Sequence, residues 1–158
     1  MEIDRVWAVY FSATDTTKKI VTVLAGEAAR TLRAEYCEYD FTLPAARKDL
    51  LVFGPRDLVI FGTPVYAGRV PNVLLGFLQE HLKGSHACAV PVTVYGNRNY
   101  DDALIELRDL LEQSRFHTVA AAAFVGEHSF SEILGSGRPD NRDVSLIREF
   151  FPCIFLEL

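Results

Sequence analysis

The segment Val6-Trp7-Ala8-Val9-Tyr10-Phe11 runs directly into Ser12-Ala13-Thr14-Asp15-Thr16-Thr17. A continuous apolar run of this kind is typical of a strand covered on both faces. The stretch after it, residues 17–32, has apolar residues at helical spacing, which predicts a helix with one face on a sheet. These apolar residues are Ile20, Val23, Leu24, Ala28 and Leu32. The order of strand, short polar loop and helix indicates a βαβ unit.

Further apolar runs continue this pattern along the chain. The predicted strands are Val6–Phe11, Ala34–Asp40, Leu58–Gly62, Cys88–Tyr95 and Val119–Val125. The second contains Glu35, Glu38 and Asp40, which favours a place at the sheet edge. Helical spacing recurs over Asn72–Leu82, Asp102–Ser114 and Val144–Phe151, and Pro152 should end the last of these helices. Asp140 and Asp143 precede that helix and suit its free backbone amides.

Alternating strands and helices with right-handed connections predict an open α/β fold. We expect a single domain over residues 1–158, built as a three-layer α/β/α sandwich. Its five strands and five helices would form a five-stranded parallel sheet in the order 2-1-3-4-5. Ligands bind such sheets outside the carboxyl ends of the strands, where the strand order reverses. The loops after the first, third and fourth strands are therefore the candidate site.

Composition and charge exclude several classes of protein. The chain has 158 residues and a formal net charge of −5, and its basic residues are scattered, which argues against nucleic-acid binding. Cys37, Cys88 and Cys153 have neither zinc nor C-x-x-C spacing, so we expect reduced thiols and no metal site. An acidic start without a long apolar stretch favours a cytoplasmic protein with no membrane partner.

The loop of residues 12–17 has features of a phosphate-binding site. Four of its six side chains are hydroxyls, beside the free amides of a helix N-terminus. It lacks the glycines and lysine of a Walker A or Rossmann loop, which leaves a terminal phosphate monoester as the candidate ligand. The alternative is simple N-capping of the helix by Ser12 or Thr14.

Two further loops each offer an aromatic ring. Tyr66 lies within residues 62–71, where an exposed ring could face a flat ligand or could pack over the following helix. Tyr100 ends the segment Tyr95-Gly96-Asn97-Arg98-Asn99-Tyr100, which could equally be an ordinary polar turn. Together, the three loops predict a site for an elongated ligand with an anionic tail and a planar head.

These loops resemble those of flavodoxins, which are FMN-binding electron carriers. Residues 12–17 are similar to the family's phosphate loop [ST]-x-T-G-x-T, and Tyr-Gly-Asn-Arg-x-Tyr at 95–100 is similar to its loop beside the isoalloxazine. Gly-Thr-Pro-Val-Tyr-Ala-Gly-Arg-Val-Pro at 62–71 and Gly-Arg-Pro-Asp at 137–140 resemble the flavodoxin half of bacterial flavodoxin–ferredoxin fusions. No Cys-rich iron–sulfur segment is present in this sequence.

The resemblance implies FMN as cofactor and redox proteins as partners, with ferredoxin-type proteins among the candidates. It does not predict an oligomeric state. The cofactor-binding residues that it implies are Ser12, Ala13, Thr14, Asp15, Thr16, Thr17, Thr63, Pro64, Val65, Tyr66, Ala67, Gly68, Tyr95, Gly96, Asn97, Arg98 and Tyr100. By analogy with the family, the peptide beside Gly68 would turn its carbonyl toward the flavin ring.

Asp15 departs from the family pattern, because flavodoxins usually have glycine at this position. A carboxylate there would repel the phosphate, unless it points to solvent near Lys18 or Lys19. Asp also tolerates left-handed backbone better than most residues. We expect Asp15→Gly to tighten FMN binding.

Three other functions are compatible with parts of this sequence. A flavin-dependent reductase would share every loop but act on its own small substrate. A phosphoacceptor receiver domain has the same strand order, but Gly62-Thr63 and Gly126-Glu127 stand where it needs a carboxylate and a lysine. The third alternative is a flavodoxin-shaped module that has lost its cofactor and serves as an interaction surface, and Asp15 is the only feature of the sequence that supports it. His128, in the loop 126–137 over the carboxyl end of the fifth strand, is interpreted as a surface residue.

Overall fold

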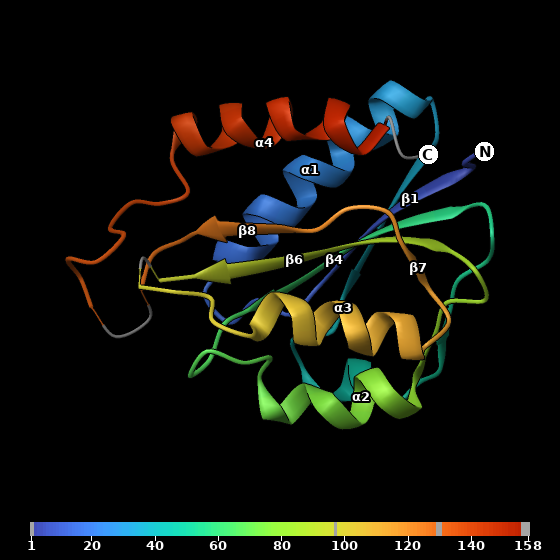
Figure 1. The fold of residues 1–158 in the computed structure, drawn as a ribbon, viewed down its shortest axis with the longest axis horizontal. Helices are drawn as coiled ribbons and strands as arrows, with labels where there is room; N and C mark the ends of the chain where they lie inside the picture. The colour runs from blue at the N-terminus through green and yellow to red at the C-terminus, as the bar shows by residue number, and fades with distance from the viewer. Residues whose placement is uncertain (1, 97, 129–130, 156–158) are drawn as a thin grey trace.

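The computed structural model describes residues 2–96, 98–128 and 131–155, with no account of the side chains of residues 153–155. Helices and strands alternate along the chain as the sequence predicts (Figure 1). The strands are β1 (Arg5–Tyr10), β2 (Glu35–Asp40), β3 (Leu51–Val52), β4 (Asp57–Pro64), β5 (Leu82–Lys83), β6 (Cys88–Tyr95), β7 (His117–Thr118) and β8 (Ala122–Val125). The α-helices are α1 (Thr16–Leu32), α2 (Leu75–Glu80), α3 (Ala103–Gln113) and α4 (Asn141–Phe155), and the 3-10 turns are η1 (Pro44–Arg47) and η2 (Asn72–Leu74).

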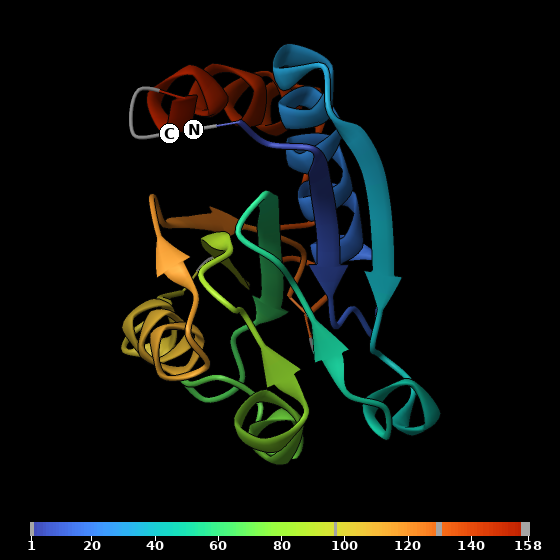
Figure 2. The same cartoon turned by 90° about the vertical axis from the view of Figure 1, so that its right-hand side faces the viewer.

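The main sheet is parallel and has the predicted order. Its strands follow the path β2-β1-β4-β6-β7, and β8 also pairs with β6. Helices α1 and α4 cover one face of this sheet, and α2 and α3 cover the other (Figure 2). The predicted three-layer α/β/α sandwich is thus confirmed, and β2 is the edge strand that its carboxylates indicated.

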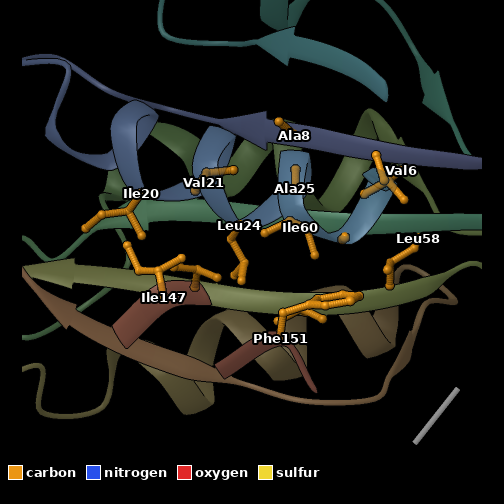
Figure 3. Close-up of a cluster of buried hydrophobic side chains, with 14 of the residues drawn as sticks. Val6, Ala8, Ile20, Val21, Leu24, Ala25, Leu58, Ile60, Ile147 and Phe151 are labelled. Carbon is orange, nitrogen blue, oxygen red and sulfur yellow. The ribbon is translucent and has the colours of Figure 1, made fainter. Parts of the chain in front are cut away.

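Each face of the sheet has its own hydrophobic core. On one face, Leu24 of α1 and Ile147 of α4 pack over Ile60, and all three are fully buried (Figure 3). On the other, Phe41, Phe61 and Phe77 form a cluster, with the rings of Phe41 and Phe77 stacked at 4.9 Å. Burying a side chain of this size contributes about 1.5–3 kcal/mol, so these clusters hold the layers together.

The predictions of the fifth strand and of a fifth helix are wrong. The fifth strand, expected over Val119–Val125, is split into β7 and β8. Four of its seven residues are alanine, which has low strand propensity, and the strand is interrupted between Thr118 and Ala122. The fifth helix is also absent from the described residues, because the crossover after β2 contains only η1 and then β3, which pairs with β5 in a small second sheet.

The helix predicted over Asn72–Leu82 is shorter than expected. It begins as the 3-10 turn η2, continues as α2, and ends at Glu80, since Leu82 instead pairs with Leu51 across the small sheet.

Thr63 and Pro64, expected in the loop after the third strand, are the last residues of β4.

The last helix begins earlier and ends later than expected. Asp140 caps its start, because the Asp140 Oδ1 atom accepts hydrogen bonds from the amides of Arg142 (2.9 Å) and Asp143 (3.1 Å). The Asp143 Oδ2 atom in turn accepts a hydrogen bond from the Asp140 amide at 2.8 Å. The predicted end of the helix at Pro152 is wrong, because the helix continues to Phe155. Proline costs the helix a single amide hydrogen bond, and the preceding turns are held against the sheet by buried Ile147 and Phe151.

Within the described residues, no helix combines the length and apolar character needed to cross a membrane. Cys37 and Cys88 form no disulfide within the described residues, and burial raises the pKa of both thiols. The side chain of Cys153 lies outside the described residues.

Candidate functional site

The first loop, residues 12–17, turns the chain from β1 into α1. Gly62 of β4 makes this packing possible, because a Cβ there would lie 2.2 Å from Cγ2 of Val21 in α1. The Ser12 hydroxyl accepts a hydrogen bond from the Lys18 amide (3.0 Å), so it caps the helix as the simpler interpretation proposed. The hydroxyls of Thr14 and Thr16 lie 3.4 Å apart.

Asp15 is the N-cap residue of α1 and adopts a left-handed backbone with φ of 62°. This is the conformation that glycine adopts most readily, which explains how Asp15 can replace the glycine usual in the resembled loop. Its side chain makes no cap hydrogen bond, so it does not occupy the amides of Thr16 and Thr17, which at the first two helix positions have no acceptor within the helix.

The lysines expected near Asp15 have other partners. Lys19 Nζ donates to the Pro139 carbonyl at 2.7 Å, and Lys18 Nζ lies 5.9 Å from the ring centre of Tyr10. The structure therefore pairs neither ammonium group with Asp15, whose side chain is exposed at the start of α1.

The second loop, residues 62–71, forms a tight turn with Tyr66 at its start. Ala67 and Gly68 both have positive φ (51° and 74°), and Tyr66 and Arg69 exchange hydrogen bonds of 3.0 and 3.1 Å. The Tyr66 ring lies nearly perpendicular to that of Phe11, with ring centroids 6.4 Å apart, and Tyr66 is 40% exposed. Burial raises the pKa of its phenol, which stays neutral at physiological pH.

The Gly68 carbonyl already has a partner in this structure. It accepts a hydrogen bond from the Asp102 amide at 3.1 Å, which joins the second loop to the start of α3. Turning this carbonyl elsewhere would require that bond to break. An ion pair between Arg69 and Glu106 (2.8 Å) makes a second link between the loop and α3.

The third loop, residues 95–101, follows β6 at the same edge of the sheet. Tyr100 is 38% exposed, and its ring centroid lies 5.5 Å from that of Tyr95. The Tyr100 carbonyl accepts a hydrogen bond from the Ala103 amide (2.9 Å), which fixes the loop to the start of α3. Tyr66 and Tyr100 thus both expose their rings at the carboxyl ends of neighbouring strands, as predicted.

The remaining predicted residues differ in accessibility. Ala13 and Arg98 are exposed, and Pro64 and Val65 are half-buried, with the Val65 amide donating to the Val94 carbonyl (2.9 Å). Thr63 is fully buried, and its hydroxyl has no hydrogen-bond partner among the described residues. Asn97 lies outside the described residues.

The described residues of a fourth loop, 126–128 and 131–137, include Gly126 and His128, which contact the first and third loops and were not among the predicted binding residues. A Cβ at Gly126 would lie 2.5 Å from Thr16 Cγ2, and a Cβ at Gly96 would lie 2.6 Å from His128 Cδ2. The glycines at these positions allow the fourth loop to approach the first and third loops closely. Gly96 and Gly126 were the only sequence signal for this contact.

The sheet order and the loops at its carboxyl edge define a flavodoxin-like fold. An archaeal flavodoxin superposes with a TM-score of 0.65 at 11% identity, covering 95% of both chains. A Streptococcus pneumoniae flavodoxin gives 0.64 at 13% identity, covering 98% of this chain and 99% of its own. The apo form of an NADH:FMN oxidoreductase gives 0.68 at 19% identity, covering 98% of this chain and 90% of its own. No protein-family model and no curated protein sequence matches the chain.

The residues at this edge fit a flavin mononucleotide. The free amides of Thr16 and Thr17 and the hydroxyls of Thr14 and Thr16 are donors of the kind that hold a phosphate. Tyr66 and Tyr100 offer two partly exposed rings suited to a planar group. Asp15 is the one residue of the first loop whose charge opposes an anion.

Proposed function

We propose that this protein binds FMN at the carboxyl edge of its sheet and carries electrons between redox partner proteins. The main support is the exposure of Tyr66 (40%) and Tyr100 (38%) at the carboxyl ends of β4 and β6, the same edge of the sheet from which α1 begins. Structural similarity to two flavodoxins agrees with this proposal.

Each loop would have a separate task in this function. The amides and hydroxyls of the first loop would bind the phosphate, and Tyr66 and Tyr100 would hold the ring and exclude water from it. Bound FMN supplies the electron-transfer chemistry itself. The chain contributes placement and charge, and its net charge of −5 disfavours further negative charge on the bound group.

Adding FMN to the purified protein tests this proposal directly. We expect flavin absorption bands that stay with the protein through gel filtration. A preparation that remains colourless after incubation with excess FMN would end the proposal.

Variants of the two tyrosines test where the flavin binds. Tyr66→Ala and Tyr100→Ala should each weaken FMN binding about five- to tenfold, the size expected for the loss of an aromatic stack. Tyr36→Ala is the matched control, because Tyr36 is 41% exposed but lies on the edge strand β2. Equal losses in all three variants would contradict binding at the predicted edge.

A flavin-dependent reductase is the second candidate. It is favoured by the similarity to an NADH:FMN oxidoreductase, which superposes with the highest TM-score of the three structures compared above. Sustained consumption of NADH or NADPH by the FMN-loaded protein would support this activity. A loaded protein that does not consume either nucleotide would favour an electron carrier.

A further inference from the structure

The two edges of the main sheet differ in charge. At one edge, β2 carries Glu35, Glu38 and Asp40, and charged residues of this kind keep an edge strand from pairing with another chain. At the other edge, the segment from Val119 to Gly126 has no charged residue. Among the described residues β8 pairs only with β6, and Figure 1 looks onto its open side, between α4 and α3. This second edge therefore lacks the protection that β2 has.

The backbone of β8 directs two of its residues toward the open side. The Gly126 amide donates to the Tyr95 carbonyl at 2.8 Å, on the side of β6. Successive residues of a strand turn their amide and carbonyl groups to alternate sides, so Phe124 also faces β6. Ala123 and Val125 face the opposite way. Their amides and carbonyls are thus available to a further strand.

Apolar side chains flank this open edge on the side of α4. The half-buried rings of Phe124 and Phe150 meet edge to face, with centroids 6.1 Å apart. Leu146 lies one helical turn before Phe150, on the same side of α4, and is 51% exposed. Exposed apolar surface beside an unprotected strand is typical of an interaction site.

We propose that β8 pairs in antiparallel orientation with β8 of a second copy of this chain, which joins the two main sheets into one. A two-fold axis beside Phe124 would place Ala123 opposite Val125 of the second copy, and Val125 opposite its Ala123. Each of these two pairs would exchange two amide-to-carbonyl hydrogen bonds. The two Phe124 rings would become a cross-strand pair of the kind that stabilises antiparallel strands.

The charge of the chain favours a second copy as the partner at this edge. A two-fold contact brings one surface against itself, so any charge in it would face a like charge. Each copy has a formal net charge of −5, but residues 119–126 are neutral. The acidic edge strand β2 lies on the far side of the sheet, where it would not enter the contact. Of the two edges, only that of β8 lets two copies meet without repulsion.

Sedimentation velocity of the purified protein tests this association, at about 5 to about 500 µM, since so small a contact belongs to the weak class. Wild type should change from monomer to dimer across this range. Ala123→Glu puts two carboxylates at diagonal positions beside the axis and should raise the dissociation constant about tenfold or more. Ala45→Glu is the matched control, because it adds the same charge at an exposed alanine of η1, after β2.

A second variant removes a hydrogen bond of the contact and keeps the ladder of the monomer. The Ala123 amide faces away from β6, so Ala123→Pro deletes a donor that the fold does not use. By symmetry the dimer loses two hydrogen bonds, and we expect its dissociation constant to rise at least tenfold. Far-UV circular dichroism should match wild type, which separates loss of the dimer from loss of the fold.

Amide hydrogen exchange in the wild-type protein locates the contact. Exchange at Ala123 and Val125 should slow as the protein concentration rises, whereas the Glu38 amide, which faces outward on β2 by the same alternation, should keep its rate. A chain that stays monomeric to about 500 µM would overturn this inference. A dimer with unchanged exchange at Ala123 and Val125, or one that Ala123→Glu does not weaken, would also overturn it. These measurements need no FMN, so their outcome does not affect the proposed function.

Discussion

The buried polar side chains at the two ends of β4 differ in their hydrogen bonding. At the amino end, the Asp57 carboxylate is only 1% exposed and accepts hydrogen bonds from Arg5 (2.7 and 3.1 Å), Trp7 (3.3 Å) and the Gly54 amide (2.7 Å). At the carboxyl end, the hydroxyls of Thr63 and Thr93 are buried without a partner among the described residues.

The two threonines are direct neighbours in the ladder between β4 and β6, just below the second and third loops. Unpaired buried hydroxyls cost stability, whereas a carboxylate with a full set of donors contributes to it. Asp57 at the start of β4 therefore stabilises the fold, whereas Thr63 and Thr93 reduce its stability next to the candidate site.

The largest effect should come from removing the paired group at the amino end. Asp57→Ala leaves the Arg5, Trp7 and Gly54 donors without their acceptor, so we expect the free energy of unfolding to fall by about 2–4 kcal/mol. Urea denaturation measures this change, with exposed Asp49→Ala as control. A loss below that of the control would mean that the two ends do not differ as described.

Removing the ion pair between Arg69 of the second loop and Glu106 of α3 should lower the free energy of unfolding by less, because the side chain of Arg69 is 59% exposed. Hydrogen bonds from Arg69 lower the pKa of Glu106 below its ordinary value of 4.5. The stabilisation is thus complete above that value and is lost as pH falls through the lower pKa of the folded state.

Glu106→Gln should therefore reduce stability by a constant amount above about pH 5, and the difference from wild type should shrink below about pH 4. Urea midpoints measured between pH 3 and pH 7 test this dependence. A difference that grows on acidification would contradict the direction of the pKa shift.

An unpaired hydroxyl at the carboxyl end predicts a gain in stability when it is removed. Thr93→Val keeps the shape of the side chain, and it should raise the free energy of unfolding by about 1 kcal/mol. Thr22→Val is the matched control, because the Thr22 hydroxyl donates to the Lys18 carbonyl at 2.8 Å. Destabilisation by Thr93→Val would show that this hydroxyl has a hydrogen-bond partner in solution. Thr93 would then not differ from Asp57 in the way described above.

The sequence was sufficient to predict the sheet order and the three loops at its carboxyl edge. Apolar runs identify buried strands, and in a parallel sheet their carboxyl ends meet at one edge whatever the details of the helices. Thus Tyr66 and Tyr100 could be placed on that edge before their surroundings were known.

Contacts between distant segments could not be predicted in the same way. The approach of His128 to Gly96 depends on how the fourth loop folds back, and a glycine in a sequence does not show which residue will fill its space. Likewise, Leu82 was predicted as the last residue of a helix but pairs with Leu51 in the small sheet, because tertiary pairing decides the structure of short apolar segments.

Substitutions of Asp15 should give the smallest change in the free energy of unfolding. They also test FMN binding, because Asp15 lies in the predicted phosphate loop. Asp15→Gly relieves the left-handed backbone (φ 62°) and should add up to about 1 kcal/mol to the free energy of unfolding. Asp15→Asn keeps a residue that tolerates this backbone and removes only the charge. If the carboxylate opposes the phosphate, both variants should bind FMN about fivefold more tightly, the equivalent of about 1 kcal/mol for charges 4 Å apart in water. Tighter binding by Asp15→Gly alone would assign the effect to the backbone. Unchanged or weaker binding in both variants would show that the carboxylate does not oppose the ligand.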